Sequence, residues 1–198
     1  MSKNDKAGIR TWATDDRTPM RTLSSLLFDP DPLLAWRAVE SLGKVAAIVA
    51  NDNIELVKRQ LRSLLWLMND ESGGVCWNAP EAIGEIIHNV PSQMDEFGII
   101  LPAFFKEEPF ERGSRWAVAR IAPIKPDSFL SAIPELEQSL NSEDIYIKAF
   151  SIMALKAIGK KSDDSFNQKL VDDQSLVTIY DYDSGELKEL SISQIASG

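Results

Sequence analysis

The sequence predicts an all-α protein, a superhelix of about four helical pairs closed by a small C-terminal β-hairpin. Four helix-forming stretches end alike, in a small residue, an apolar residue and then Gly or Ala. The closing residues are Gly43, Gly84, Ala122 and Gly159. Their spacings of 41, 38 and 37 residues are typical of a helical repeat with two helices per unit. Beyond residue 161 the period stops, and alternation typical of strands follows.

The two helices of the first pair have clear start signals. Thr18 and Asp31 are N-cap candidates, and each precedes a proline that suits the first helical position. Apolar residues recur at helical spacing after these starts. The expected helices cover about residues 18–28, 32–50, 54–68 and 79–87.

The third and fourth pairs are less regular. The expected helices cover about residues 97–105, 112–121, 128–140 and 145–160. Pro102 is expected to kink or delay the first of them. Acidic turns precede the second helix of every pair, where carboxylates complement the helix dipole, which accounts for part of the negative charge.

The chain divides into three predicted segments: a flexible N-terminal arm over 1–17, the helical repeats over 18–161 and a capping segment over 162–198. Trp12 is the one aromatic residue of the arm, and we expect it to dock onto the first helix. Residues 177–180 and 187–192 alternate around a turn at Asp183-Ser184-Gly185, which predicts the hairpin.

Composition narrows the class of protein. The 198 residues are 44% hydrophobic and 26% charged, which is typical of a soluble globular chain with one core. The formal net charge of −9 disfavours general binding to nucleic-acid phosphates. The single cysteine suits a reducing compartment. We expect no signal peptide or membrane span, and therefore a cytoplasmic protein.

Small residues also recur inside the repeats. Four alanines stand five residues before the closing positions, at Ala38, Ala79, Ala117 and Ala154. We expect them to let the two helices of each pair approach closely, because larger side chains would force the helices apart.

Polar and aromatic residues beside these alanines form the predicted binding surface. Its candidates are Trp36, Arg37, Glu40, Asp70, Glu71, Trp77, Asn78, Glu81, Arg112, Arg115, Trp116 and Arg120. Trp36, Trp77 and Trp116 recur one or two residues before the repeat alanine. They either pack between layers or line a groove for a peptide or ligand, and Trp and Arg are enriched in binding hot spots.

The turn after the second pair's first helix is the most distinctive segment. Gly73 and Gly74 permit a close backbone approach. Asn78 and Glu81, on either side of Pro80, match a capping box at a helix start. The segment is therefore either a capped helix start or the rim of a ligand site whose free N–H groups hold an anion.

No catalytic, metal or cofactor residues are predicted. His88, the single histidine, lies near a helix C-terminus, where it complements the dipole. Cys76 has no cysteine or histidine close by in sequence, which favours a buried structural role. The sequence thus favours a protein that is not an enzyme.

The period and the Ala and Gly positions over residues 18–161 resemble armadillo-like HEAT repeats of the class labelled PBS-lyase-like. More specific strings resemble a family of uncharacterised HEAT-repeat proteins of similar length from sulfate-reducing and related anaerobic bacteria. They are Trp36-Arg37-Ala38, Asp70 to Gly74, Trp77 to Glu85, and Arg112-Gly113 with Trp116 and Arg120. The resemblance implies a cytoplasmic bacterial protein without an assigned activity, and nothing marks a bilin site.

Two enzyme families with HEAT-like folds fit less well. Deoxyhypusine hydroxylases hold iron with several His-Glu pairs, whereas His88 stands alone and is followed by Asn89. HEAT-like DNA glycosylases use a basic groove with aromatic residues. Arg112, Arg115, Arg120, Trp116 and Trp77 would imitate part of that groove. The net charge and the glutamates on the same side, Glu40, Glu81 and Glu85, argue against it.

The sequence therefore favours an interaction scaffold that binds a protein partner or peptide along the second helices. The alternative is a small-ligand binder or enzyme with a site at the Gly73-Gly74 loop and the third-repeat arginines. Nucleic-acid binding is the weaker third hypothesis.

Overall fold

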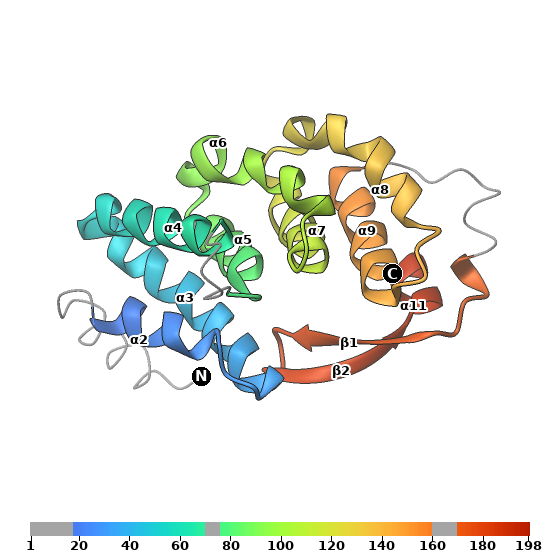
Figure 1. The fold of residues 1–198 in the computed structure, drawn as a ribbon, viewed down its shortest axis with the longest axis horizontal. Coiled ribbons are helices and arrows are strands. Elements are labelled where there is room, and N and C mark those ends of the chain that lie inside the picture. The colour runs from blue at the N-terminus through green and yellow to red at the C-terminus, as the bar shows by residue number, and fades with distance from the viewer. Residues whose placement is uncertain (1–17, 70–75, 160–169) are drawn as a thin grey trace. The chain divides into compact units, whose positions relative to one another are not determined.

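A computed structural model describes residues 18–69, 76–159 and 170–198 (Figure 1). The predictions for the arm over 1–17, for Asp70 and Glu71, and for Gly73-Gly74 fall outside the described residues. The chain forms two compact units, Met1–Gly98 and Ile99–Gly198. The described residues are mostly helical, with one two-stranded antiparallel sheet near the C-terminus.

The first unit is helical, and its α-helices and one short 3₁₀ turn follow in chain order. They are α2 (Thr18–Leu26), α3 (Pro32–Asp52), α4 (Ile54–Met68), α5 (Ala79–Asn89), η1 (Pro91–Gln93) and α6 (Met94–Phe97). Helices α3, α4 and α5 pack against one another, as Figure 1 shows. The predicted start of α3 is confirmed, since the Asp31 carboxylate accepts a hydrogen bond from the N–H of Leu33.

The core of this unit is aliphatic. Its largest fully buried side chains are Leu27, Leu42, Leu61, Leu64, Ile83, Ile86 and Ile87. Gly43 marks the place where α3 and α5 come closest. A Cβ atom there would lie 2.6 Å from Asn89 Nδ2 and 2.8 Å from the Glu85 carbonyl oxygen. Glycine is therefore required at this crossing by contact with the neighbouring helix.

The second unit contains more irregular helix. Its elements are η2 (Gly98–Lys106, the first residue belonging to the other unit), α7 (Glu111–Ile121), η3 (Ala122–Ile124), η4 (Pro126–Ala132), α8 (Ile133–Ser139) and α9 (Ile145–Ile158). Helix α9 packs against α7 and α8. The Asp144 carboxylate caps α9 at its start, and Gly159 ends it at a φ of 83°.

Two predicted α-helices are wrong in type. The segment expected over 97–105 is mainly the 3₁₀ helix η2, and the segment over 128–140 is half 3₁₀ helix. Prolines explain both differences. Pro102 removes an amide donor inside η2, and Pro134 permits a regular α-helix to begin only at Ile133.

The predicted C-terminal hairpin is confirmed. Strands β1 (Leu176–Asp181) and β2 (Glu186–Ser191) are antiparallel, with Leu176 opposite Ser191 and Asp181 opposite Glu186. Gly185, at a φ of 69°, closes the turn. The second strand begins and ends one residue earlier than predicted, because Ile192 already begins helix α11 (Ile192–Ser197).

Helix α11 was not predicted, although its start has a sequence signal. Ser191 and Gln194 form a capping box in which each side chain bonds the other's backbone N–H. The hairpin and α11 pack on α9 (Figure 1). Lys156 Nζ of α9 donates to the Ile195 and Ala196 carbonyls at 3.0 and 3.2 Å, which fastens the C-terminal segment to the helices.

None of the described helices has both the length and the apolar character that crossing a membrane requires.

Candidate functional site

The predicted surface residues do not share one environment. Arg37, Trp77 and Arg112 are exposed, and four residues are half-buried: Trp36, Glu40, Asn78 and Arg120. Glu81, Arg115 and Trp116 are buried. These residues therefore form separate groups, and each group lies within one of the two units.

In the first unit the side chain of Trp77, just before α5, is exposed to solvent. Trp77 is 70% exposed, and Phe28, just beyond the end of α2, is 51% exposed. Asn78 Nδ2 donates to the Leu27 carbonyl oxygen at 2.8 Å, which ties the start of α5 to the end of α2. We call Phe28, Asp29, Asp31 and Trp77 the Trp77 corner.

The predicted capping box at this helix start is wrong. The Asn78 side chain makes no capping bond to α5, and its Nδ2 instead donates to the Leu27 carbonyl. The Glu81 side chain does not form the other bond of a capping box, to the backbone N–H of Asn78, either. It is buried, and its Oε2 has no hydrogen-bond partner within the part of the chain that the structure describes.

Burial raises the pKa values of two groups close in sequence to Trp77, Glu81 and Cys76. It raises the pKa of the Glu81 carboxyl to about 8, so this side chain is mainly protonated at neutral pH. Burial also raises the pKa of the Cys76 thiol to about 12, and the nearby Glu81 charge adds to the effect. Cys76 thus remains a thiol at neutral pH, which leaves it a poor nucleophile.

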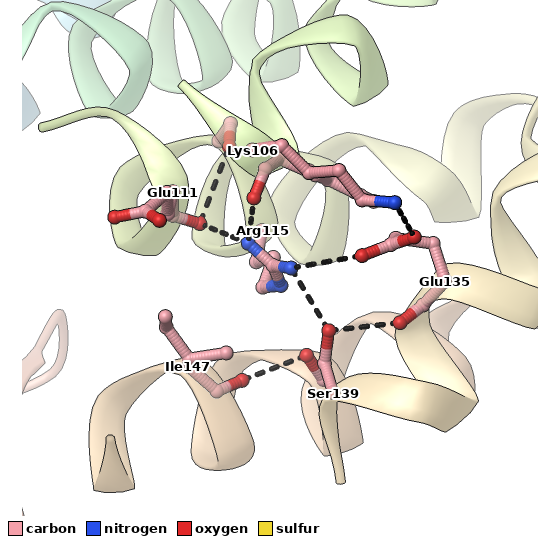
Figure 2. A network of polar contacts seen from close by, with 9 residues as sticks. Lys106, Glu111, Arg115, Glu135, Ser139 and Ile147 are labelled. Carbon is pink, nitrogen blue, oxygen red and sulfur yellow. Dashed lines mark hydrogen bonds and ion pairs between the residues drawn. The ribbon is translucent and has the colours of Figure 1, made fainter. Parts of the chain in front are cut away.

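In the second unit Arg115 lies at the centre of a polar network (Figure 2). Its Nη1 donates to the carbonyls of Phe105 and Glu111, each at 2.8 Å. Its Nη2 donates to Ser139 Oγ at 2.8 Å and lies 3.9 Å from Glu135 Oε1. Figure 2 shows the guanidinium pointing toward Glu135 and Ser139, so Arg115 links η2, α7 and α8.

An open pocket of about 270 Å³ adjoins this network. Its charged lining residues are two cations and two carboxylates: Lys106, Arg115, Glu111 and Glu135. Lys106 Nζ lies 2.7 Å from Glu135 Oε2, so the opposite charges are already paired. Burial lowers the pKa of Arg115, with Glu135 opposing this, and its Nε has no hydrogen-bond partner among the described residues.

The remaining surface candidates of the second unit contact their own unit. Trp116 is 3% exposed, and its ring stacks on Tyr182 with centroids 6.5 Å apart and planes at 19°. The Arg120 guanidinium lies 4.2 Å from the centroid of the same Tyr182 ring. Tyr182 follows β1, so the hairpin covers Trp116.

Arg112 is also engaged. It forms an ion pair with Asp144 at 2.7 Å and lies 5.0 Å from the centre of the Tyr146 ring. The sequence around Arg112 does not predict these partners, because Asp144 and Tyr146 lie at the start of α9, more than 30 residues later. His88 is exposed in the last turn of α5, as its position suggested.

No group of three or more His, Cys, Asp or Glu side chains within residues 18–69, 76–159 and 170–198 is arranged to hold a metal ion. Among the exposed large apolar side chains of the described residues, that of Trp77 has the largest exposed fraction.

Comparison with known proteins gives one similar sequence. A protein of Archaeoglobus fulgidus, named only as an uncharacterized protein, is 28% identical over 161 residues, which cover 80% of this chain and 84% of that one. No family model matches the sequence. No solved structure matches it either.

Proposed function

We propose that this protein is an interaction scaffold built from HEAT-like helical pairs, and that it docks a partner segment at the Trp77 corner. The observation that supports this most is the exposure of Trp77, which has 70% of its surface open to solvent at a fixed helix start. Tryptophan is the side chain most enriched among residues that dominate binding energy.

The corner is also held in place before any partner arrives. The 2.8 Å bond from Asn78 to Leu27 fixes the segment next to Trp77, and Ala79 and Pro80 behind it are buried. A preorganised contact loses less conformational entropy on binding than a flexible one. This favours recognition at Trp77 over an accidental exposure of the ring.

The arginines of the second unit give less support to the other hypotheses. Arg112 pairs with Asp144, Arg115 is buried in its network, and Arg120 lies on Tyr182. A nucleic-acid groove needs cations that reach phosphates, and these three are engaged within the unit. Small-ligand binding in the open pocket is the second candidate, and the pair of Lys106 and Glu135 on its lining already neutralises both of these charges.

The experiment compares tagged baits expressed in the native host, with bound proteins measured by quantitative mass spectrometry. The baits are wild type, Trp77→Ala and Trp66→Ala. Trp66 is a matched control, because it is a tryptophan of the same unit that is 64% exposed. We expect Trp77→Ala to lose at least one partner that wild type and Trp66→Ala retain. Identical partners for all three baits would contradict the proposal.

A further inference from the structure

The charge around Trp77 indicates what kind of partner fits. Asp29 and Asp31 lie in the turn between α2 and α3, two and four residues beyond Leu27, whose carbonyl accepts the bond from Asn78. Both carboxylates therefore follow closely in the chain on the residue that Asn78, the neighbour of Trp77, contacts. No cation among the described residues pairs with either of them.

Each carboxylate uses one oxygen locally. Asp29 Oδ1 accepts from the N–H of Asp31, and Asp31 Oδ1 accepts from the N–H of Leu33, both at 2.9 Å. Asp31 is exposed, and Asp29 is half-buried. Their negative charges are thus available to a ligand that approaches the exposed ring.

We infer that the Trp77 corner binds a lysine or arginine side chain of a basic, partly apolar protein segment. The face of a tryptophan ring attracts cations more strongly than that of any other side chain. A cation placed there also lies in the field of two carboxylates, while Phe28 offers apolar surface to the rest of the segment. An acidic segment would be repelled by the same groups.

The inference rests on the proposed function and specifies its partner class. It is tested with the full-length protein and two synthetic peptides of alternating sequence, one of Leu and Lys and one of Leu and Glu. Binding is measured by isothermal titration calorimetry at low and physiological salt, beside an ultracentrifugation measurement without peptide.

We expect saturable binding of the Lys peptide and none of the Glu peptide. Trp77→Ala should weaken binding about tenfold or more, on the scale of a cation–π contact plus lost apolar contact. Asp31→Asn should weaken it severalfold without uncapping α3, because asparagine is an equally good N-cap. Glu143→Gln, in an exposed acidic turn of the second unit, is the control and should bind like wild type.

Four outcomes would overturn the inference: no saturable binding of the Lys peptide, equal binding of the Glu peptide, equal loss in Glu143→Gln and Asp31→Asn, or self-association that Trp77→Ala abolishes. The first three would leave the proposed scaffold function standing if the bait experiment still shows a Trp77-dependent partner. The fourth would assign the corner to a second copy of the chain.

Discussion

The two units use tryptophan in opposite ways. In the first unit Trp77 is 70% exposed beside α5, whereas in the second unit Trp116 is 3% exposed on α7. Tyr182 of the C-terminal segment covers Trp116. The comparison teaches that a residue type repeated at nearly the same place can be exposed in one unit and packed in another.

The difference has a geometric cause. Trp77 stands two residues before the repeat alanine Ala79, whereas Trp116 stands one residue before Ala117. One residue along an α-helix rotates a side chain by about 100°. Moreover, Trp77 precedes the first residue of α5, while Trp116 lies inside α7. The position equivalent to Trp77 in the second unit is Arg115, which is buried in its own network.

The largest expected effect is the contrast between the two tryptophans themselves. Trp116→Ala should lower the free energy of unfolding by about 3–5 kcal/mol, because it leaves a cavity under Tyr182. Trp77→Ala should change it by at most about 0.5 kcal/mol, as exposed substitutions do. Urea unfolding followed by circular dichroism measures both. Similar losses in the two variants would show that Trp77 is a packing residue.

Substitution of Arg115 should give the next largest loss of stability, and it tests whether this side chain holds the second unit together. Arg115→Ala should cost about 2–4 kcal/mol of unfolding free energy, because it leaves the Phe105 carbonyl and Ser139 without their donor. The matched change Arg112→Ala removes an exposed ion pair and should cost at most about 1 kcal/mol. Thermal melts of both variants provide the test, and equal melting temperatures would refute the structural role of Arg115.

A substitution at Gly43 tests the close packing of α3 against α5, the helix that follows Trp77. Gly43→Ala should destabilise the protein by about 1–2 kcal/mol, since overpacking exceeds the helix-propensity gain of alanine. Adding Asn89→Ala removes one of the contacting atoms but leaves the Glu85 carbonyl, so little stability should return. A Gly43→Ala protein more stable than wild type would show that the two helices separate easily.

Glu81 gives an effect that depends on pH, because its carboxyl is buried and its Oε2 has no partner among the described residues. Burial raises its pKa from 4.5 to about 8. Above pH 4.5 the unfolded chain releases this proton while the folded chain keeps it, so stability falls until about pH 8 and then levels. One such group gives a slope of up to about 1.4 kcal/mol per pH unit.

Glu81→Gln should remove that slope, because glutamine has the same shape and no proton to lose. Denaturant unfolding at pH 5, 6, 7 and 8 should show the variant gaining on wild type as the pH rises. Parallel pH profiles for the two proteins would mean that Glu81 is ionised in the folded state.

Much of the fold follows from local signals. Asp31 caps α3 as expected, Asp144 of an acidic turn caps α9, Gly159 ends α9, and the hairpin lies where alternation begins. The errors lie where proline converts expected α-helix to 3₁₀ helix, and at α11, whose capping box at Ser191 was readable. HEAT-like stacking of the pairs stays a prediction.

The candidate site was less predictable, because its decisive contacts join distant residues. Asn78 bonds Leu27 across 51 positions, a contact that the local capping pattern does not indicate. Trp116 meets Tyr182 from a different segment altogether. Periodicity gives the positions of the tryptophans, but exposure depends on which distant element packs over each one.

The most direct test of the central claim is photo-crosslinking in the native host. A benzophenone amino acid placed at position 77 is compared with the same group at position 66, and both proteins are checked for an unchanged melting temperature. We predict a specific adduct from position 77 that is absent from position 66. No adduct from position 77, or the same adducts from both positions, would contradict recognition at the Trp77 corner.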